Sequence, residues 1–222
     1  MASQITHIVY GKVVLDKFLK DKGVDEDKFY IGTVFPDIRY LGTIEREKTH
    51  ITEPKQSELL NNNDSFCMGV YAHSMIDREH ARVVEERGLW NIIQRNKFSV
   101  YAWKFIEDVV TYSYFDDWES VSKALNNILD EETSVVDENV AKKWHQILSV
   151  YFQQPPSIET ALVFARELKG FSPEVVREMR GEMEKIEGSP EAMKIIRDTH
   201  RNLFLGKRTS GFDPVGRVPV VL

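Results

Sequence analysis

Apolar residues recur along most of this chain at intervals of three and four, the spacing of one face of an α-helix. Two helix starts are marked by the same tripeptide, Ser172-Pro173-Glu174 and Ser189-Pro190-Glu191. In each, serine caps the helix, proline takes the first helical position and glutamate meets the positive end of the dipole. The alternation typical of a β-sheet is missing apart from a short stretch at Val218–Leu222. The sequence therefore predicts an all-α fold.

The expected helices follow from this spacing and from capping residues. They cover Ile5–Lys20, Ser65–Arg87 with Asp64 or Ser65 as the cap, Ser99–Tyr114, Trp118–Leu129, Asp137–Phe152 and Ile158–Leu168, followed by the two that begin at Ser172 and Ser189. Phe29–Phe35 is predicted as a short apolar segment that ends at Pro36, and Arg39–Asn63 as a long polar loop.

With 222 residues, the chain is long enough to bury a large core. We expect one helical metal-binding domain over residues 1–205 and an extended tail over 206–222, which is rich in glycine and proline. A boundary between two domains at Pro155-Pro156 is the less favoured alternative.

Charge and cysteine content limit the class of protein. A net charge of −6 disfavours nonspecific binding of nucleic acid. The single cysteine, Cys67, excludes an internal disulfide and fits a cytoplasmic protein. Residues 1–6 lack the charged and apolar regions of a signal peptide, and no apolar stretch is long enough for a transmembrane segment. We therefore expect a cytoplasmic protein.

The predicted helix after Asp64 carries polar residues on a face that should point inward. His73, Asp77 and His80 fall within roughly 60° of one another on the helix surface. A carboxylate on such a face must be paired or must bind a metal, because an isolated buried charge is too costly. The His-x-x-x-Asp spacing of His73 and Asp77 lets both side chains reach one metal ion. From this helix alone, a His–Asp hydrogen bond in the core is the simpler interpretation.

Other residues in the first third of the chain favour a metal site. Three of the six histidines and two aspartates gather there as candidate ligands: His7, Asp37, His50, His73 and Asp77. Neutral imidazole and carboxylate suit zinc best, although manganese or iron can take the same ligands. His145 and His200 lie far along the chain on amphipathic helices, and we expect them to be structural or exposed.

Four motifs in this region, taken in order, resemble the zinc-dependent phospholipase C family, which is all-helical and related to the P1-type nucleases. They are Thr6-His7-Ile8, Phe29-x-x-Gly32-x-x-x-Pro36-Asp37, Thr49-His50 and Gly69-x-Tyr71-x-x-x-x-x-Asp77. The resemblance covers residues 5–80, about a third of the chain. It implies the multi-helix fold of that family.

The resemblance also implies which residues hold metal ions. Asp37, His50, His73 and Asp77 would bind one zinc ion, and Asp77 would bridge to a second ion bound by His7. In that family the N-terminal amine of the mature chain helps to bind the second ion, whereas here six residues precede His7. The family's third ion needs a His-x-x-x-Glu pair, which does not follow in this sequence. His80 is a possible first ligand for it, with a carboxylate from Glu85, Glu86, Glu107 or Asp108. We therefore expect a one- or two-metal site.

Two divalent ions bridged by a carboxylate are typical of enzymes that hydrolyse phosphate esters. The prediction is a phospholipase C-like phosphoesterase acting on phosphodiester or phosphomonoester bonds, with phospholipid as one candidate substrate. The resemblance suggests Asp37 as the catalytic residue that orients the attacking water. Arg39, Arg46 and Lys48 flank the predicted site and are candidates to steer an anionic substrate, although charged loop residues are more often simply solvated.

Other functions remain open. The protein could be a non-catalytic helical protein in which metal, or a His–Asp network, only organises the fold. It could also be a protein-interaction domain whose C-terminal helices form the partner surface. A phosphohydrolase with a His-Asp dyad is disfavoured, because no histidine here is directly followed by aspartate. The aromatic residues of Tyr101–Trp103, Tyr112–Phe115 and Trp118 are predicted as helix core rather than as a membrane-facing lip.

Overall fold

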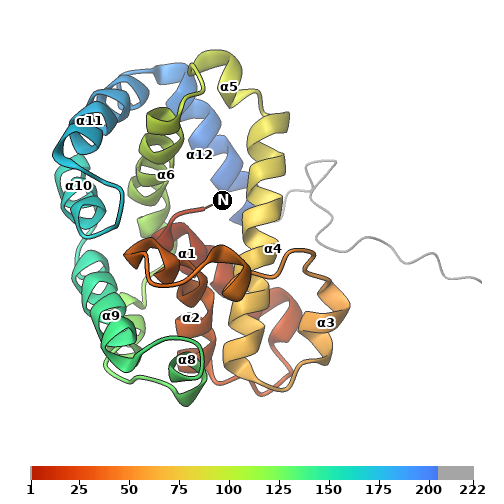
Figure 1. The fold of residues 1–222 in the computed structure, drawn as a ribbon. Coiled ribbons are helices and arrows are strands. Elements are labelled where there is room, and N and C mark those ends of the chain that lie inside the picture. The colour runs from red at the N-terminus through yellow and green to blue at the C-terminus, as the bar shows by residue number, and fades with distance from the viewer. Residues whose placement is uncertain (1, 205–222) are drawn as a thin grey trace, which may run out of the picture.

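The computed structural model describes residues 2–204 and contains helices but no strand in that range (Figure 1). The α-helices are α1 (Gln4–Val14), α2 (Glu26–Val34), α3 (Gln56–Asn61), α4 (Ser65–Glu86), α5 (Leu89–Ile92), α6 (Lys97–Thr111), α7 (Trp118–Ala124), α8 (Asp130–Thr133), α9 (Glu138–Phe152), α10 (Ile158–Arg166), α11 (Pro173–Glu187) and α12 (Pro190–Phe204). The all-α prediction is confirmed for these residues. The predicted tail over 206–222, including Val218–Leu222, lies outside them.

The helices surround the beginning of the chain. In Figure 1, α4 runs along one side of the molecule, and α9, α10 and α11 form a curved flank on the other, with α1 and α6 between them. The N-terminal end of the described chain lies in the middle of this arrangement, and Ala2 is buried. No helix in the described part of the chain has both the length and the apolar character needed to cross a membrane.

Local capping explains where several helices begin. The Asp64 carboxylate accepts a hydrogen bond from the Cys67 amide at 2.8 Å and caps α4, and Gly88, with a φ of 69°, follows its end. The predicted serine caps are also present. The hydroxyl of Ser172 accepts a hydrogen bond from Val175 N, and the hydroxyl of Ser189 accepts one from Ala192 N.

Other local predictions were wrong. Phe29–Phe35 belongs largely to α2, and the chain continues past Pro36 in a 3-10 helix, Phe35–Leu41. Proline is tolerated there because it stands in the first turn of that 3-10 helix, where its missing N–H is not needed. The predicted loop over 39–63 contains α3 and a 3-10 turn, Arg46–Lys48. The first helix changes to a π-helix, Leu15–Leu19, after Val14, and α7 stops at Ala124 rather than continuing to residue 129.

Two glycines let α2 and α4 approach closely. A Cβ added to Gly32 would lie 2.1 Å from the Phe66 carbonyl oxygen, and one added to Gly69 would lie 2.2 Å from the Phe29 carbonyl oxygen. Only glycine fits such a backbone contact. The contact places the C-terminal part of α2 against the first turns of α4.

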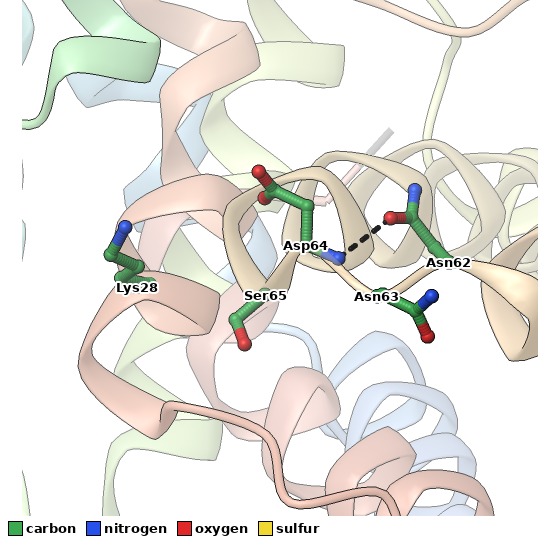
Figure 2. Close-up of a pocket in the computed structure, with 5 residues that line it drawn as sticks. All are labelled: Lys28, Asn62, Asn63, Asp64 and Ser65. Atoms are coloured by element: carbon green, nitrogen blue, oxygen red, sulfur yellow. Dashed lines mark hydrogen bonds between the residues drawn. The ribbon is translucent and has the colours of Figure 1, made fainter.

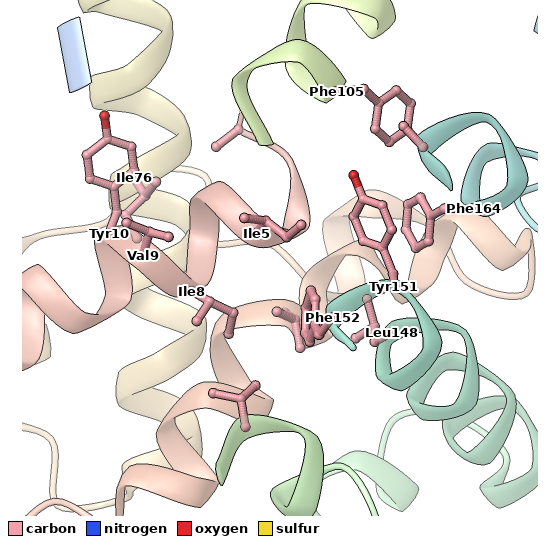
Figure 3. Close-up of a cluster of buried hydrophobic side chains, with 14 of the residues drawn as sticks. Ile5, Ile8, Val9, Tyr10, Ile76, Phe105, Leu148, Tyr151, Phe152 and Phe164 are labelled. Carbon is pink, nitrogen blue, oxygen red and sulfur yellow. The ribbon is translucent and has the colours of Figure 1, made fainter. Parts of the chain in front are cut away.

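A single cluster of buried apolar side chains extends from Ala2 to Ile196. Figure 3 shows part of it, where Ile5 and Ile8 of α1 lie near Leu148 and Phe152 of α9. Helices before and after Pro155 contribute to the same cluster. The predicted aromatic core is confirmed for Trp103, Phe115 and Trp118, which are buried, whereas Tyr114 is exposed.

Candidate metal centre

The five predicted ligands lie on four separate segments. His7 is on α1, Asp37 on the 3-10 helix after α2, His50 in the loop before α3, and His73 and Asp77 on α4. All five are buried, with exposed fractions between 0% and 8%. The structure therefore brings together side chains that are up to 70 residues apart in sequence.

Their ligand atoms form two groups that share His73. One oxygen or nitrogen from each of His7, Asp37 and His73 lies within 4.8 Å of the others, and the same holds for His50, His73 and Asp77. Asp77 faces both sides, because its Oδ1 is 3.3 Å from His7 Nε2 and its Oδ2 is 3.8 Å from His73 Nε2. This position is what a carboxylate that bridges two ions would need.

Hydrogen bonds on the far side of two rings fix their tautomers. His7 Nδ1 lies 3.0 Å from the carbonyl oxygen of Ser3, and His73 Nδ1 lies 2.8 Å from that of Thr33. A carbonyl can only accept, so each Nδ1 carries the proton and donates it. In the neutral rings, Nε2 is therefore a bare lone pair.

The same reasoning applies to the third ring. Thr49 donates its hydroxyl proton to a backbone carbonyl, that of Pro36 at 2.9 Å. The contact of 3.0 Å between Thr49 Oγ1 and His50 Nδ1 must then be a hydrogen bond donated by the ring. His50 Nε2 is thus a lone pair as well, and it lies 3.2 Å from the lone pair of His73 Nε2.

In these contacts hydrogen-bond acceptors face other acceptors. Three imidazole lone pairs and two carboxylates converge, and only a proton or a metal cation between them makes the arrangement favourable. Burial lowers the pKa of His50 to about 4 and that of His73 to about 3, so no proton lies between these two rings at neutral pH. Burial opposes ionisation of Asp37 and Asp77, but the adjacent His73 and His7 hold both pKa values below the ordinary value. Neutral imidazoles whose other nitrogen donates to a carbonyl or hydroxyl, together with ionised carboxylates, fit a divalent transition metal.

Two of the three predicted basic residues reach the cluster. The Arg39 guanidinium lies 3.7 Å from Asp37 Oδ1, and the Arg46 guanidinium lies 3.5 Å from Asp77 Oδ2. Lys48 is exposed on the 3-10 turn. The two arginines thus contact the ligand carboxylates directly, rather than only flanking them in sequence.

The N-terminal segment folds back into the site, which sequence reasoning did not predict. The backbone N–H of Ala2 donates to Asp77 Oδ1 at 2.9 Å. Asp108 holds this segment by accepting from Ser3 Oγ at 2.6 Å and from both the amide and the hydroxyl of Thr6 at 2.9 Å. Asp108 therefore positions the helix that carries His7, and its carboxylate is already occupied by donors.

His80 belongs to a different buried network. Its Nε2 lies 2.7 Å from Glu107, whose other oxygen is 3.0 Å from His200 Nε2, and Tyr10 OH lies 2.7 Å from His200 Nδ1. Burial opposes ionisation of Glu107, but His80 and His200 lower its pKa to about 2. His200 is therefore structural and buried, and His145 likewise pairs with a buried carboxylate at 2.8 Å.

A second polar feature lies at the start of α4. Figure 2 shows a hollow lined by Lys28, Asn62, Asn63, Asp64 and Ser65. None of the five predicted ligands borders it, and Lys28 Nζ is bonded to Glu131 at 2.7 Å. The hollow is not part of the metal centre.

No family model, no curated protein and no solved structure matches this chain. The relationship to the zinc-dependent phospholipases C therefore stays a prediction. What the protein does has to be inferred from the five clustered side chains themselves.

Proposed function

We propose that the protein is a metal-dependent phosphoesterase that binds one or two divalent ions, zinc before others, at His7, Asp37, His50, His73 and Asp77. The observation that supports this most directly is the meeting of three imidazole lone pairs with two carboxylates inside the protein. Such a cluster is unfavourable without a cation and is the donor set that zinc prefers.

The resemblance to the zinc-dependent phospholipases C suggests how the ions would be shared. Asp37, His50 and His73 would hold one ion, His7 would hold the other, and Asp77 would contact both. When bound, divalent ions at these positions would supply Lewis acidity toward a phosphoryl oxygen and activate water for attack on phosphorus.

Protein groups around the ligands have defined roles in this proposal. Gln4 donates to Asp37 Oδ2 at 2.7 Å and so fixes the orientation of that carboxylate. Asp37 also borders a small cavity, which makes it the ligand best placed to orient a water molecule or a substrate. Arg39 and Arg46 add positive charge beside the carboxylates, which favours an anionic substrate.

A non-catalytic role is the main alternative. The His80–Glu107–His200 network shows that this chain also uses buried histidines in pairs that need no metal. The two cases differ in one respect. In that network the Nε2 atom of each ring meets a carboxylate oxygen of Glu107, whereas in the cluster His50 and His73 present lone pairs to each other.

Elemental analysis of the purified protein tests the proposal, with a His73→Ala/Asp77→Ala variant beside it. We expect at least one equivalent of zinc, manganese or iron in the parent and its loss in the variant. His145→Ala, which removes a buried histidine outside the cluster, is the control and should keep its metal. A metal-loaded parent should then hydrolyse p-nitrophenyl phosphate, bis(p-nitrophenyl) phosphate or phosphatidylcholine. No metal in the parent after incubation with excess zinc would refute the proposal, and bound metal without hydrolysis would favour the non-catalytic role.

A further inference from the structure

Lys104 is a buried cation that forms no ion pair with any described residue. It lies on α6 and is 6% exposed. Among the described residues, none accepts a hydrogen bond from its ammonium group or forms an ion pair with it. Removing most of the water from around a lysine side chain is costly unless an anion lies close to its ammonium group. A lysine kept in such a place requires an explanation.

The Lys104 side chain borders a cavity of about 30 Å³ that it shares with the metal centre. Gln4 and Asp37 line the same cavity. Gln4 Nε2 donates to Asp37, and Gln4 Oε1 is buried without a hydrogen-bond partner. The cavity therefore lies between a predicted metal ligand, Asp37, and the Lys104 side chain.

The remaining walls of the cavity are largely apolar. Tyr101, Phe105 and Phe164 contribute to them, and the rings of Phe105 and Phe164 lie beside each other with centroids 5.9 Å apart (Figure 3). Apolar walls weaken screening, so an anion that enters the cavity is attracted to Lys104 more strongly than it would be at the surface.

Asp37 attracts this charge, because Lys104 helps to lower the pKa of Asp37, but the two groups form no ion pair. Its Oδ2 already accepts from Gln4, and its Oδ1 faces Arg39 and His50 at 3.7 and 3.8 Å. No ion pair joins it to Lys104. Lys104 therefore has no ion-pair partner in direct contact among the described residues.

We propose that Lys104 binds a terminal, unesterified oxygen of the phosphoryl group of the substrate, and of the phosphate released from it. This inference rests on the proposed function, which supplies the phosphate ester at Asp37. The cavity has room for about one or two water-sized groups, so it accepts an oxygen rather than an ester chain. The substrate is therefore a phosphate ester whose phosphoryl group enters with a free oxygen toward α6.

Calorimetric titration with inorganic phosphate tests this role on the full chain loaded with metal and freed of excess ion. Lys104→Met keeps the length of the side chain and removes its charge, and we expect it to bind phosphate at least tenfold more weakly than the parent. Lys97→Met makes the same change at an exposed position on the same helix and should bind phosphate as the parent does. Elemental analysis should show equal metal in all three proteins.

Thermal unfolding gives a second readout that a structural lysine would not produce. Phosphate should raise the Tm of the parent but not that of Lys104→Met, whereas without phosphate the Tm of the variant should equal or exceed that of the parent. If Lys104→Met does not fold, Lys104→Arg, which keeps the charge, should retain phosphate binding. In the parent labelled with ¹³C-lysine, the Lys104 Cε resonance, assigned with Lys104→Arg, should then move as phosphate is added.

Equal phosphate affinity in the parent and Lys104→Met, or no phosphate binding by the metal-loaded parent, would overturn this role for Lys104. A parent that binds no metal would refute the proposed function instead. In that case the same titration of the metal-free chain decides the matter. If the metal-free parent binds phosphate and Lys104→Met binds it more weakly, Lys104 is an anion site but the proposed enzyme function is refuted. If the two proteins bind phosphate equally, or neither binds it, both the proposed function and the role of Lys104 are refuted.

Discussion

The imidazole rings of His7 and His73 stack on each other, with centroids 3.9 Å apart and an angle of 9° between their planes. Each ring is held by a backbone carbonyl on its Nδ1 side, and each directs Nε2 toward Asp77. The carbonyl that holds His73 belongs to Thr33 on α2, so the orientation of this ring depends on how closely α2 packs against α4. Metal binding should therefore respond to substitutions that never touch a ligand.

Gly69→Ala is expected to push α2 away from α4, because the new methyl group would lie 2.2 Å from the Phe29 carbonyl oxygen. Overpacking of this kind costs about 1–3 kcal/mol of unfolding free energy. The shift should also weaken the hydrogen bond from His73 to Thr33 and lower metal affinity by about 10- to 100-fold. Urea unfolding and a metal-competition titration measure the two effects.

Gly181→Ala is the matched control for this change. It makes the same substitution within α11, where a Cβ would meet no atom within 4 Å. We expect it to raise stability by roughly 0.5–1 kcal/mol, since alanine favours the helix, and to leave metal affinity unchanged. Gly69→Ala with the stability and affinity of the parent would show that the two helices do not touch at this point.

Thr49→Val tests whether support from outside the ligand set orients His50. Valine has nearly the shape of threonine but cannot accept the proton of His50 Nδ1 or bond to the Pro36 carbonyl. Loss of such support typically lowers metal affinity about 10- to 100-fold, and the loss of buried hydrogen bonds costs about 1–3 kcal/mol.

Thr133→Val provides the comparison, because the Thr133 hydroxyl bonds to a backbone carbonyl at an exposed position. This control should retain the metal affinity of the parent. If Thr49→Val binds metal as tightly as Thr133→Val, the orientation of His50 does not depend on Thr49.

Acid should destabilise the metal-free chain through His50 and His73. Their pKa values in the folded protein are about 4 and about 3, both lowered by burial, against about 6.5 in an unfolded chain. Between these values the unfolded chain binds more protons than the folded one. The contribution of these two histidines to the free energy of unfolding is therefore fully present above pH 6.5 and is lost as the pH falls toward 4. We expect the unfolding free energy in urea to fall by about 1–3 kcal/mol between pH 7 and pH 4.5.

A His50→Gln/His73→Gln variant isolates this contribution from that of other acid-sensitive groups. Its unfolding free energy should depend less steeply on pH than that of the parent over the same range. An identical slope in both metal-free proteins would mean that these two histidines are not held neutral in the folded state.

Helix starts and ends could be read from the sequence where the signal is local. Asp64 before α4 and Ser172 before α11 each accept from an amide three residues away, so these caps can be predicted without any tertiary contact. The spacing that puts His73 and Asp77 on one face of α4 is equally local. Phe29–Phe35 was misjudged because a short apolar run followed by proline is ambiguous, and only its packing on α4 shows it to be helical.

The sequence by itself determined that His73 and Asp77 share one face of a helix, because side-chain direction along a helix follows from spacing alone, and it offered His7, Asp37 and His50 as further candidate ligands. Only the tertiary structure decided which of these residues meet. The close contact at Gly32 and Gly69 sets the distance between α2 and α4. It thereby places the Thr33 carbonyl against His73 Nδ1, which fixes the tautomer of the ring that faces Asp77. In the same way Lys104 looks like any lysine in the sequence, and only its surroundings in the structure leave it without an ion pair among the described residues. Distances between helices depend on the packing of the whole chain, so they cannot be predicted from a local sequence pattern.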